Sequence, residues 1–296
     1  MQRLSLLKCA HNHSKTGIKT MILNTKADIL ITHSFHFDNT KMHGLSGHLF
    51  EVLDYYWYFK NKGVNVKCLI PEVVTKETFN DFITGHYSVD FDLNDIYFLD
   101  TKILAIKARN ILVTDGGYWF LNQYKSKLLG KVFAFACGPS FFESAAKPEY
   151  VTFLADHKMY PGLGINYTKK VLPHLNHIPG DKPFAHITKN CRALSESQIK
   201  DLIRDYPDIV MYSDYLNIPN STNKPIKNFN FSKYVYTPIM RHFDCSPRLI
   251  IECRILGIEF DLWNIDYKDP GLERRLESNL DQFILNDSDD IINYFN

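Results

Sequence analysis

Short apolar runs alternate with longer amphipathic segments along the first third of the chain. Ala27–Phe35 (ADILITHSF) predicts a buried strand, whereas Leu49–Lys62 (LFEVLDYYWYFKNK) has the spacing of an amphipathic helix, with Gly63 where a C-terminal cap belongs. The next strand is predicted at Val64–Ile70 and ends at Pro71. Strands that alternate with helices are typical of parallel α/β layers.

The same pattern continues to about the middle of the chain. Four more short runs, rich in Val, Ile and Phe and bounded by Gly, Asp or Pro, predict strands at Asp95–Leu99, Asn110–Thr114, Lys131–Ala136 and Tyr150–Ala155. We expect these strands to join the first two in one sheet with helices on both faces.

The pattern is interrupted between Pro161 and Lys182, where PGLG, a short helical piece (Tyr167–Leu175) and HIPGDKP indicate a join between domains. A second series follows, with strands predicted at Pro183–Thr188, Ile209–Ser213, Lys233–Thr237 and Ile258–Trp263, and helices at Ser195–Tyr206 and Pro247–Leu256. Ser195 suits the N-cap of the first of these helices. Residues 270–296 are acidic and predicted to be helical.

The chain is therefore predicted to form two α/β domains that face a central cleft. We expect an N-terminal domain over residues 1–170, a C-terminal domain over 171–280, and a final helix over 281–296 that crosses back to the first domain. In open α/β sheets, ligands sit outside the carboxyl ends of the strands, so the loops after the strands should carry the chemistry.

Composition narrows the class of protein. Lys and Arg number 34 and Asp and Glu 33, so the net charge of +1 implies no bulk electrostatic partner, whereas nucleic-acid binders usually carry a basic excess. The six cysteines are scattered without a CxxC pair, which disfavours a zinc site and favours a reducing compartment. Neither a secretory signal nor a run of about 20 apolar residues is present, so we expect a soluble, cytoplasmic protein. Nothing in the sequence indicates the oligomeric state.

The most informative segment is YTPIMRHFDCSPRLIIECRILGIEF, residues 236–260. Asp244 and Glu252 are separated by seven residues, and Ser246 suits the N-cap of the predicted helix that holds Glu252. The free N–H groups at a helix N-terminus favour a phosphate, and Arg248 in the first turn would add a bidentate contact. Glu252 would accept hydrogen bonds from ribose hydroxyls. The alternative is a surface helix in which Arg248 and Glu252 form an i,i+4 ion pair.

This segment resembles the acid-x7-Glu donor-binding motif of the GT-B glycosyltransferases, enzymes with two Rossmann-like domains. The resemblance implies that Glu252 binds the donor ribose, although the first acidic position, usually Glu, is Asp244 here. GT-B enzymes often place a basic residue after the first strand of the C-terminal domain, which makes Lys189 and Arg192 (HITKNCR) candidates for neutralising the donor diphosphate. An ordinary solvated basic loop is the alternative for that segment.

A metal and a cofactor are not expected. No DxD lies between the predicted strands of the two domains, and Asp90 and Asp92 (VDFDL), which have that spacing, lie in a polar stretch before a strand. The loop after the first strand, residues 33–48 (HSFHFDNTKMHGLSGH), contains no GxGxxG, so a dinucleotide cofactor is not supported. Its Gly44 and Gly47 permit a close approach of the backbone to a ligand.

An inverting transfer needs a base that takes the proton of the acceptor hydroxyl. Of the loop histidines His33, His36, His43 and His48, we select His43, beside Gly44, and interpret the others as loop or core residues. Two strand-end aspartates compete with it: Asp115 (LVTDGGY) and Asp156 (YVTFLADHKMYP). Either is alternatively a turn-capping carboxylate.

The Asp156 segment also resembles the base-bearing segment of phage DNA β-glucosyltransferases. This likeness implies phage DNA as an acceptor, with the sugar placed on a hydroxylated or hydroxymethylated cytosine or on a glycosylated base. Other acceptors, such as a glycan or a small molecule, remain open, as do a nucleotide-sugar 2-epimerase and a non-catalytic nucleotide-binding or structural phage protein. The predicted enzyme is thus a hexosyl- or pentosyltransferase that uses a nucleotide-sugar as its substrate.

Overall fold

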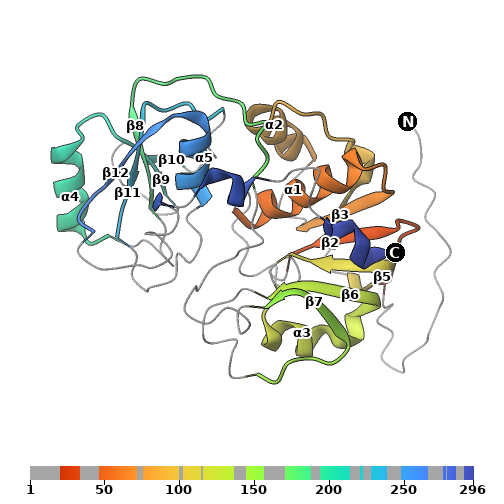
Figure 1. The fold of residues 1–296 in the computed structure, drawn as a ribbon. Helices are drawn as coiled ribbons and strands as arrows, with labels where there is room; N and C mark the ends of the chain where they lie inside the picture. The colour runs from red at the N-terminus through yellow and green to blue at the C-terminus, as the bar shows by residue number, and fades with distance from the viewer. Residues whose placement is uncertain are drawn as a thin grey trace.

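The chain builds two parallel β-sheets with helices packed on them (Figure 1). The structure is a computed structural model, and it describes residues 21–33, 47–71, 76–99, 103–114, 116–136, 145–156, 171–187, 194–213, 221–222, 228–238, 248–265, 276–277, 279–284 and 290–296. The predicted α/β class with parallel strands is confirmed.

The first sheet has seven strands: β1 (Met21–Asn24), β2 (Ile29–Thr32), β3 (Val66–Pro71), β4 (Ile96–Leu99), β5 (Ile103–Val113), β6 (Leu128–Ala136) and β7 (Val151–Asp156). Their order is β4-β3-β2-β5-β6-β7, β1 pairs with β5, and every pairing is parallel. The helices of this part are α1 (Gly47–Asn61), α2 (Lys76–His86) and α3 (Tyr118–Tyr124), with 3-10 turns η2 (Leu93–Asp95) and η3 (Lys125–Lys127). The strand order reverses between β2 and β5, which is the switch point of a doubly wound sheet.

The second sheet repeats the same plan with five strands. These are β8 (Pro183–Ile187), β9 (Val210–Ser213), β10 (Ser221–Thr222), β11 (Lys233–Tyr236) and β12 (Glu259–Leu262), in the parallel order β10-β9-β8-β11-β12. Its helices are α4 (Glu196–Asp205) and α5 (Arg248–Leu256), and the chain ends with η6 (Leu280–Phe283) and η7 (Asp290–Phe295). The switch point of this sheet lies between β8 and β11.

Residues that alternate along each strand supply two separate apolar layers. In β2, Ile29 and Ile31 belong to the core cluster that includes α1, whereas Leu30 belongs to a cluster with Phe120 and Leu121 of α3. Successive side chains of a strand point to opposite faces, so a strand that is apolar throughout needs helices on both sides. This is the arrangement that the sequence predicts.

The ends of two helices follow from local sequence. Gly63 has φ of 75°, and the N–H groups of Gly63 and Val64 bond the carbonyls of Lys60 and Phe59 at 3.0 and 3.1 Å, which closes α1 in a Schellman motif. At the start of α4, Ser195 and Gln198 form a capping box. Both boundaries agree with the predicted caps.

One apolar core extends across both sheets. The cluster that contains Leu53 and Phe59 of α1 also contains Phe184 of β8, Tyr234 of β11 and Ile250 of α5. Backbone hydrogen bonds strengthen this junction: Asn228 N–H donates to Gly85 O at 2.6 Å, and Ile178 N–H donates to Asn228 O at 2.9 Å. The face of the first sheet that carries α1 and α2 is thus packed against the face of the second sheet that carries α5.

The last residues of the chain return to the first sheet. The ring of Phe295 lies 5.2 Å from that of Phe59 and 4.5 Å from that of Phe133, and Asn110 Nδ2 donates to Phe295 O at 3.3 Å. Figure 1 shows this end of the chain beside β5, far along the sequence but close in space. The described part of the final helix expected over 281–296 consists of 3-10 helix, residues 281–283 in η6 and Asp290–Phe295 in η7.

The prediction of a helical piece over Tyr167–Leu175 is wrong for its described part. Val171 pairs with Ile284 and Leu175 with Tyr87 as isolated β-bridges, so residues 171–175 form an extended strap. Apolar side chains spaced like a helix face are buried here by packing against α2 and η6, a tertiary effect that periodicity does not show. Strands β1 and β10 and helix α2 were not predicted.

No helix in the described part of the chain is long and apolar enough to cross a membrane.

Phe295→Ala should lower the free energy of unfolding by about 3 kcal/mol, because it removes a side chain that is 6% exposed and leaves a cavity between α1 and β6. Its neighbour Tyr294 is 55% exposed, so Tyr294→Ala should change stability by less than about 0.5 kcal/mol. Urea denaturation of the two variants tests whether the end of the chain packs on the first sheet. Equal losses of unfolding free energy in the two variants would contradict that packing.

Candidate functional site

The predicted site residues lie at or after the carboxyl ends of a few strands. His43, Gly44 and Gly47 follow β2, and Asp115 follows β5, so both groups leave the strands that flank the first switch point. Of these residues the structure describes Gly47, the first residue of α1. His43, Gly44 and Asp115 lie outside the described residues.

The predicted donor-binding residues leave the strands that flank the second switch point. Lys189 and Arg192 follow β8, while Asp244 and Ser246 lie between β11 and α5. These four residues also lie outside the described part of the chain. β8 and β11 are hydrogen-bonded neighbours, so the two segments leave adjacent strand ends at the same edge of the sheet.

Asp156 is the last residue of β7 and pairs in register with Ala136 of β6. It therefore lies at the carboxyl edge of the first sheet, but two strands away from β5 and the switch point. His33, interpreted from sequence as a loop or core residue, ends the described segment after β2 and is fully buried. Its Nε2 lies 3.7 Å from Oε2 of the buried Glu51 on α1.

Arg248 and Glu252, two of the predicted donor residues, are brought together in a buried polar cluster at the junction of the sheets. Arg248 Nε donates to Glu252 Oε1 at 2.6 Å, and Nη1 donates to Asp54 Oδ2 of α1 at 2.6 Å. Nη2 donates to the hydroxyl of Tyr87 at 3.2 Å, and that hydroxyl donates to Asp54 Oδ1 at 3.2 Å. The i,i+4 ion pair that was the alternative interpretation is present, although it is buried and not at the surface.

Aromatic rings enclose this cluster. Phe50 of α1 stacks on His86 with ring centroids 4.1 Å apart, and the guanidinium of Arg248 lies 5.3 Å from the centre of the Phe50 ring. On its other side His86 lies 4.4 Å from the ring of Phe229, and its Nε2 is 3.8 Å from Glu252 Oε1. The exposed fractions of the charged side chains are 12% for Arg248, 4% for Glu252 and zero for Asp54.

Burial shifts the protonation of these groups. Burial raises the pKa of Asp54 to about 6, against the opposing pull of Arg248, and the charge of Glu252 raises it further. Burial also raises the pKa of Glu252, but Arg248 and His86 outweigh it and hold that pKa below its ordinary value. The pKa of His86 is lowered by burial, so the neutral imidazole is favoured. Above pH 6 two carboxylates therefore share one guanidinium.

Sequence reasoning missed Asp54, Tyr87 and His86. A signal for Asp54 exists: it lies inside the helix LFEVLDYYWYF, where nearly every neighbour is apolar. A carboxylate in such a setting is buried and needs a cationic partner. The identity of that partner, 194 residues away in the chain, is not written in the local pattern.

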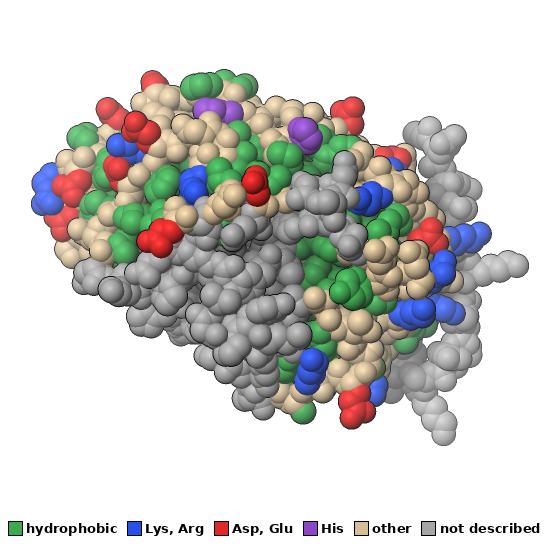
Figure 2. Space-filling view, in the orientation of Figure 1, with side chains coloured by type: hydrophobic (Ala, Val, Ile, Leu, Met, Phe, Trp, Pro, Cys, Tyr) green, Lys and Arg blue, Asp and Glu red, His purple; other side chains and the backbone are tan. Residues whose placement is uncertain are grey.

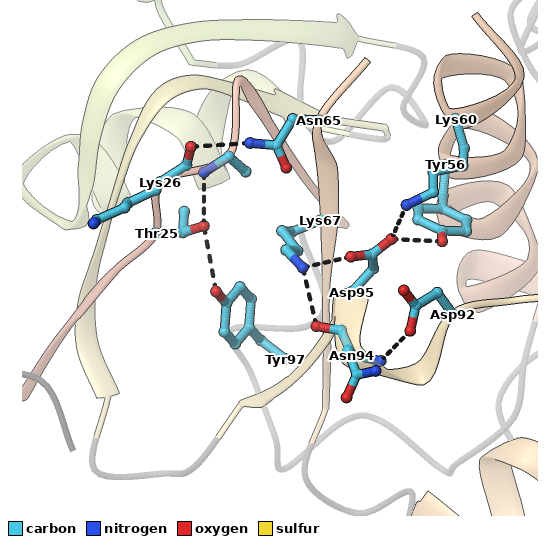
Figure 3. Close-up of polar contacts among 11 residues, drawn as sticks. Thr25, Lys26, Tyr56, Lys60, Asn65, Lys67, Asp92, Asn94, Asp95 and Tyr97 are labelled. Atoms are coloured by element: carbon cyan, nitrogen blue, oxygen red, sulfur yellow. Dashed lines mark hydrogen bonds and ion pairs between the residues drawn. The ribbon is translucent and has the colours of Figure 1, made fainter. Parts of the chain in front are cut away.

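A second polar cluster lies at the amino edge of the first sheet (Figure 3). Asp95 accepts hydrogen bonds from Tyr56 at 2.9 Å, from Lys60 at 2.5 Å and from Lys67. These contacts outweigh burial and lower the pKa of Asp95. Because the cluster lies beside the starts of β3 and β4, away from the strand ends where ligands bind, we assign it to the stability of the sheet.

The described residues contain no group of three or more His, Cys, Asp or Glu side chains placed to hold a metal ion. Asp92, one of the two residues with DxD spacing, accepts the N–H of Asn94 at 2.9 Å and caps η2. The face in Figure 2 shows charges of both signs over α4, where Lys200 pairs with Glu196 and Arg204 with Asp201. Such exposed pairs contribute little to stability.

Arg248→Met should lower the free energy of unfolding at pH 7.5 by about 3–5 kcal/mol, because two buried carboxylates lose the guanidinium that bonds both of them. Asp54→Asn should not lower it, since it leaves one carboxylate and one guanidinium. The pH dependence of stability follows from the raised pKa of Asp54. Between about pH 4 and 6 the folded chain binds a proton that the unfolded chain has lost, so the contribution of Asp54 to stability falls as pH rises through that window. Denaturation of both variants at pH 7.5 measures the difference, and equal losses would refute it.

No family model matches this chain, and no curated protein and no solved structure matches it either.

Proposed function

We propose that this chain is a GT-B glycosyltransferase that moves a hexosyl or pentosyl group from a nucleotide-sugar donor to an acceptor hydroxyl. One observation carries the proposal: the four strands that flank the two switch points, β2, β5, β8 and β11, are strands after which the sequence has predicted site residues. Ligands of doubly wound sheets bind at such points. Asp156, at the end of β7, is the exception.

The donor would bind at the second sheet. Lys189 and Arg192, after β8, would neutralise the diphosphate, and the free N–H groups of the first turn of α5 would donate hydrogen bonds to its oxygens. Asp244 and Ser246 belong to the segment that leads into α5. This arrangement supplies positive charge from side chains and backbone, and so we propose that transfer needs no metal.

Arg248 and Glu252 are bonded differently from what the donor motif predicts. In the sequence interpretation Arg248 contacts a phosphate and Glu252 the donor ribose. In the structure three N–H groups of Arg248 are bonded to Glu252, Asp54 and Tyr87, and Glu252 is 3% exposed. A direct contact with the donor would require the buried cluster to open, so we assign both residues first to holding the start of α5 against α1.

In the transfer step a base removes the proton of the acceptor hydroxyl while the hydroxyl oxygen bonds to the anomeric carbon of the sugar. The bond from that carbon to the diphosphate breaks, and the nucleoside diphosphate leaves with the electron pair. Asp156, Asp115 and His43 are the candidate bases. For the acceptor we propose a hydroxylated or hydroxymethylated cytosine in DNA, on the resemblance of the Asp156 segment to phage enzymes.

A nucleoside diphosphate or nucleotide-sugar should raise the melting temperature of the protein equally with and without EDTA. Saturation at about 100 times Kd adds about 2.7 kcal/mol of stability. Replacing both Lys189 and Arg192 by Ala should abolish most of this response, whereas Lys182→Ala should preserve it, because Lys182 precedes β8 at the opposite end of the strand. Failure of every nucleotide in a panel to shift the melting temperature would overturn the proposed function.

Asp156→Asn should leave nucleotide affinity unchanged and reduce transfer by about 100-fold or more, as expected when a general base is lost. Calorimetry measures the affinity, and labelled sugar transferred to hydroxymethylcytosine-containing DNA measures the rate. Full activity in this variant would move the base to Asp115 or His43. Parallel variants at those two positions would then identify it.

A further inference from the structure

A buried polar cluster lies where the two sheets meet. It consists of Asp54, Tyr87, His86, Arg248 and Glu252. Asp54 comes from α1, His86 and Tyr87 come from the end of α2 and the residue after it, and Arg248 and Glu252 come from α5. Within the described chain these are the ionisable groups that face Asp54 across the junction, Tyr87 and Arg248 by direct hydrogen bonds. Opening the junction would expose all of them to water.

The charges in this cluster do not balance. Asp54 and Glu252 each accept a hydrogen bond from the same guanidinium, at 2.6 Å in both cases. His86 is the other group near Glu252 that can carry positive charge, and its burial between Phe50 and Phe229 favours the neutral ring. With both carboxylates ionised, the described groups of the closed junction hold one excess negative charge, and burying a charge in excess is costly.

We propose that Asp54, Arg248 and Glu252 form a proton-sensitive latch between the two sheets, in which the excess carboxylate charge keeps the junction able to open at neutral pH. One proton on Asp54, or the loss of its charge, balances the charges and closes the latch. The inference does not depend on the proposed function, because the latch acts on the contact between α1 and α5 whatever ligand the chain binds.

The direction of the effect follows from linkage. Asp54 has a raised pKa in the closed junction and an ordinary one when water reaches it, so closing takes up a proton and ionisation favours opening. His86 has the opposite effect, since its lowered pKa means that opening takes up a proton at low pH. A pH titration of the native chain therefore mixes the two groups, whereas comparison with an Asp54 variant isolates Asp54.

Two variants separate the latch from an ordinary structural bond. Asp54→Asn and Glu252→Gln each remove one carboxylate charge and keep a polar side chain of the same shape. If the carboxylates merely hold Arg248, both variants should loosen the junction. If the charge of Asp54 is in excess, Asp54→Asn should tighten it, whereas Glu252→Gln should loosen it, because the lowered pKa of Glu252 means that its ionised form favours the closed junction. Asp28→Asn is the matched control, because Asp28 pairs with Arg109 at 3.7 Å on the surface, where its side chain is 50% exposed.

Hydrogen exchange of the backbone amides, corrected for intrinsic rates, measures the opening. At pH 7.5 the α1 and α5 amides of Asp54→Asn should show an opening constant lower by about ten-fold or more than in the native chain, which corresponds to one pKa unit or more. Those of Glu252→Gln should show a higher opening constant than the native chain. The difference between native and Asp54→Asn should shrink from pH 6 toward pH 4. Helix α4, which packs on the far face of the second sheet, should not change, and neither should Asp28→Asn.

Faster exchange of α5 in Asp54→Asn would overturn the latch and leave a purely structural ion pair, and slower exchange in Glu252→Gln would overturn it as well. An equal change in α4 would also overturn it, because the effect would then be global stability and not the junction. Nucleotide binding is measured separately on the native chain. A latch without nucleotide binding would refute the proposed function alone, and nucleotide binding without a latch would refute this inference alone.

Discussion

The contact on which the described architecture depends is the burial of Arg248 between Asp54 and Glu252. Two sheets share one apolar core, and where they meet a guanidinium is bonded to α1, to Tyr87 after α2, and to its own helix. Apolar packing has no direction, whereas these hydrogen bonds fix how α5 meets α1. The arrangement is specific because each donor has one acceptor, and it carries a cost because one negative charge is in excess.

This contact also changes how the motif from Asp244 to Glu252 is interpreted. The seven-residue spacing from Asp244 to Glu252 favours a donor site, and the helix that it predicts is present as α5. The side chains of Arg248 and Glu252 nevertheless point into the junction and are satisfied there. The same residues that a nucleotide would be expected to meet hold the sheets together, so any ligand at the start of α5 would be coupled to the junction.

The two sheets place the remaining candidates by topology. Each strand order reverses once, and the residues predicted from sequence follow the strands on both sides of each reversal, with Asp156 as the exception. Charged residues elsewhere have structural explanations: Asp95 bonds three side chains at the amino edge, and the pairs on α4 are exposed. The distinction between the edges of a sheet separates these groups from the candidate site.

The sequence by itself determined what depends on neighbours in the chain. The strand at Ile29–Thr32, the cap at Gly63 and the capping box at Ser195 follow from periodicity and from local hydrogen bonding, so they were predictable. Only the tertiary structure decided what depends on distant partners. The strap at Val171–Leu175 is extended because α2 and η6 bury it, and Asp54 meets Arg248 because the two sheets share a core. Local pattern cannot encode such contacts, since their free energy comes from surfaces that become adjacent only when the chain has folded.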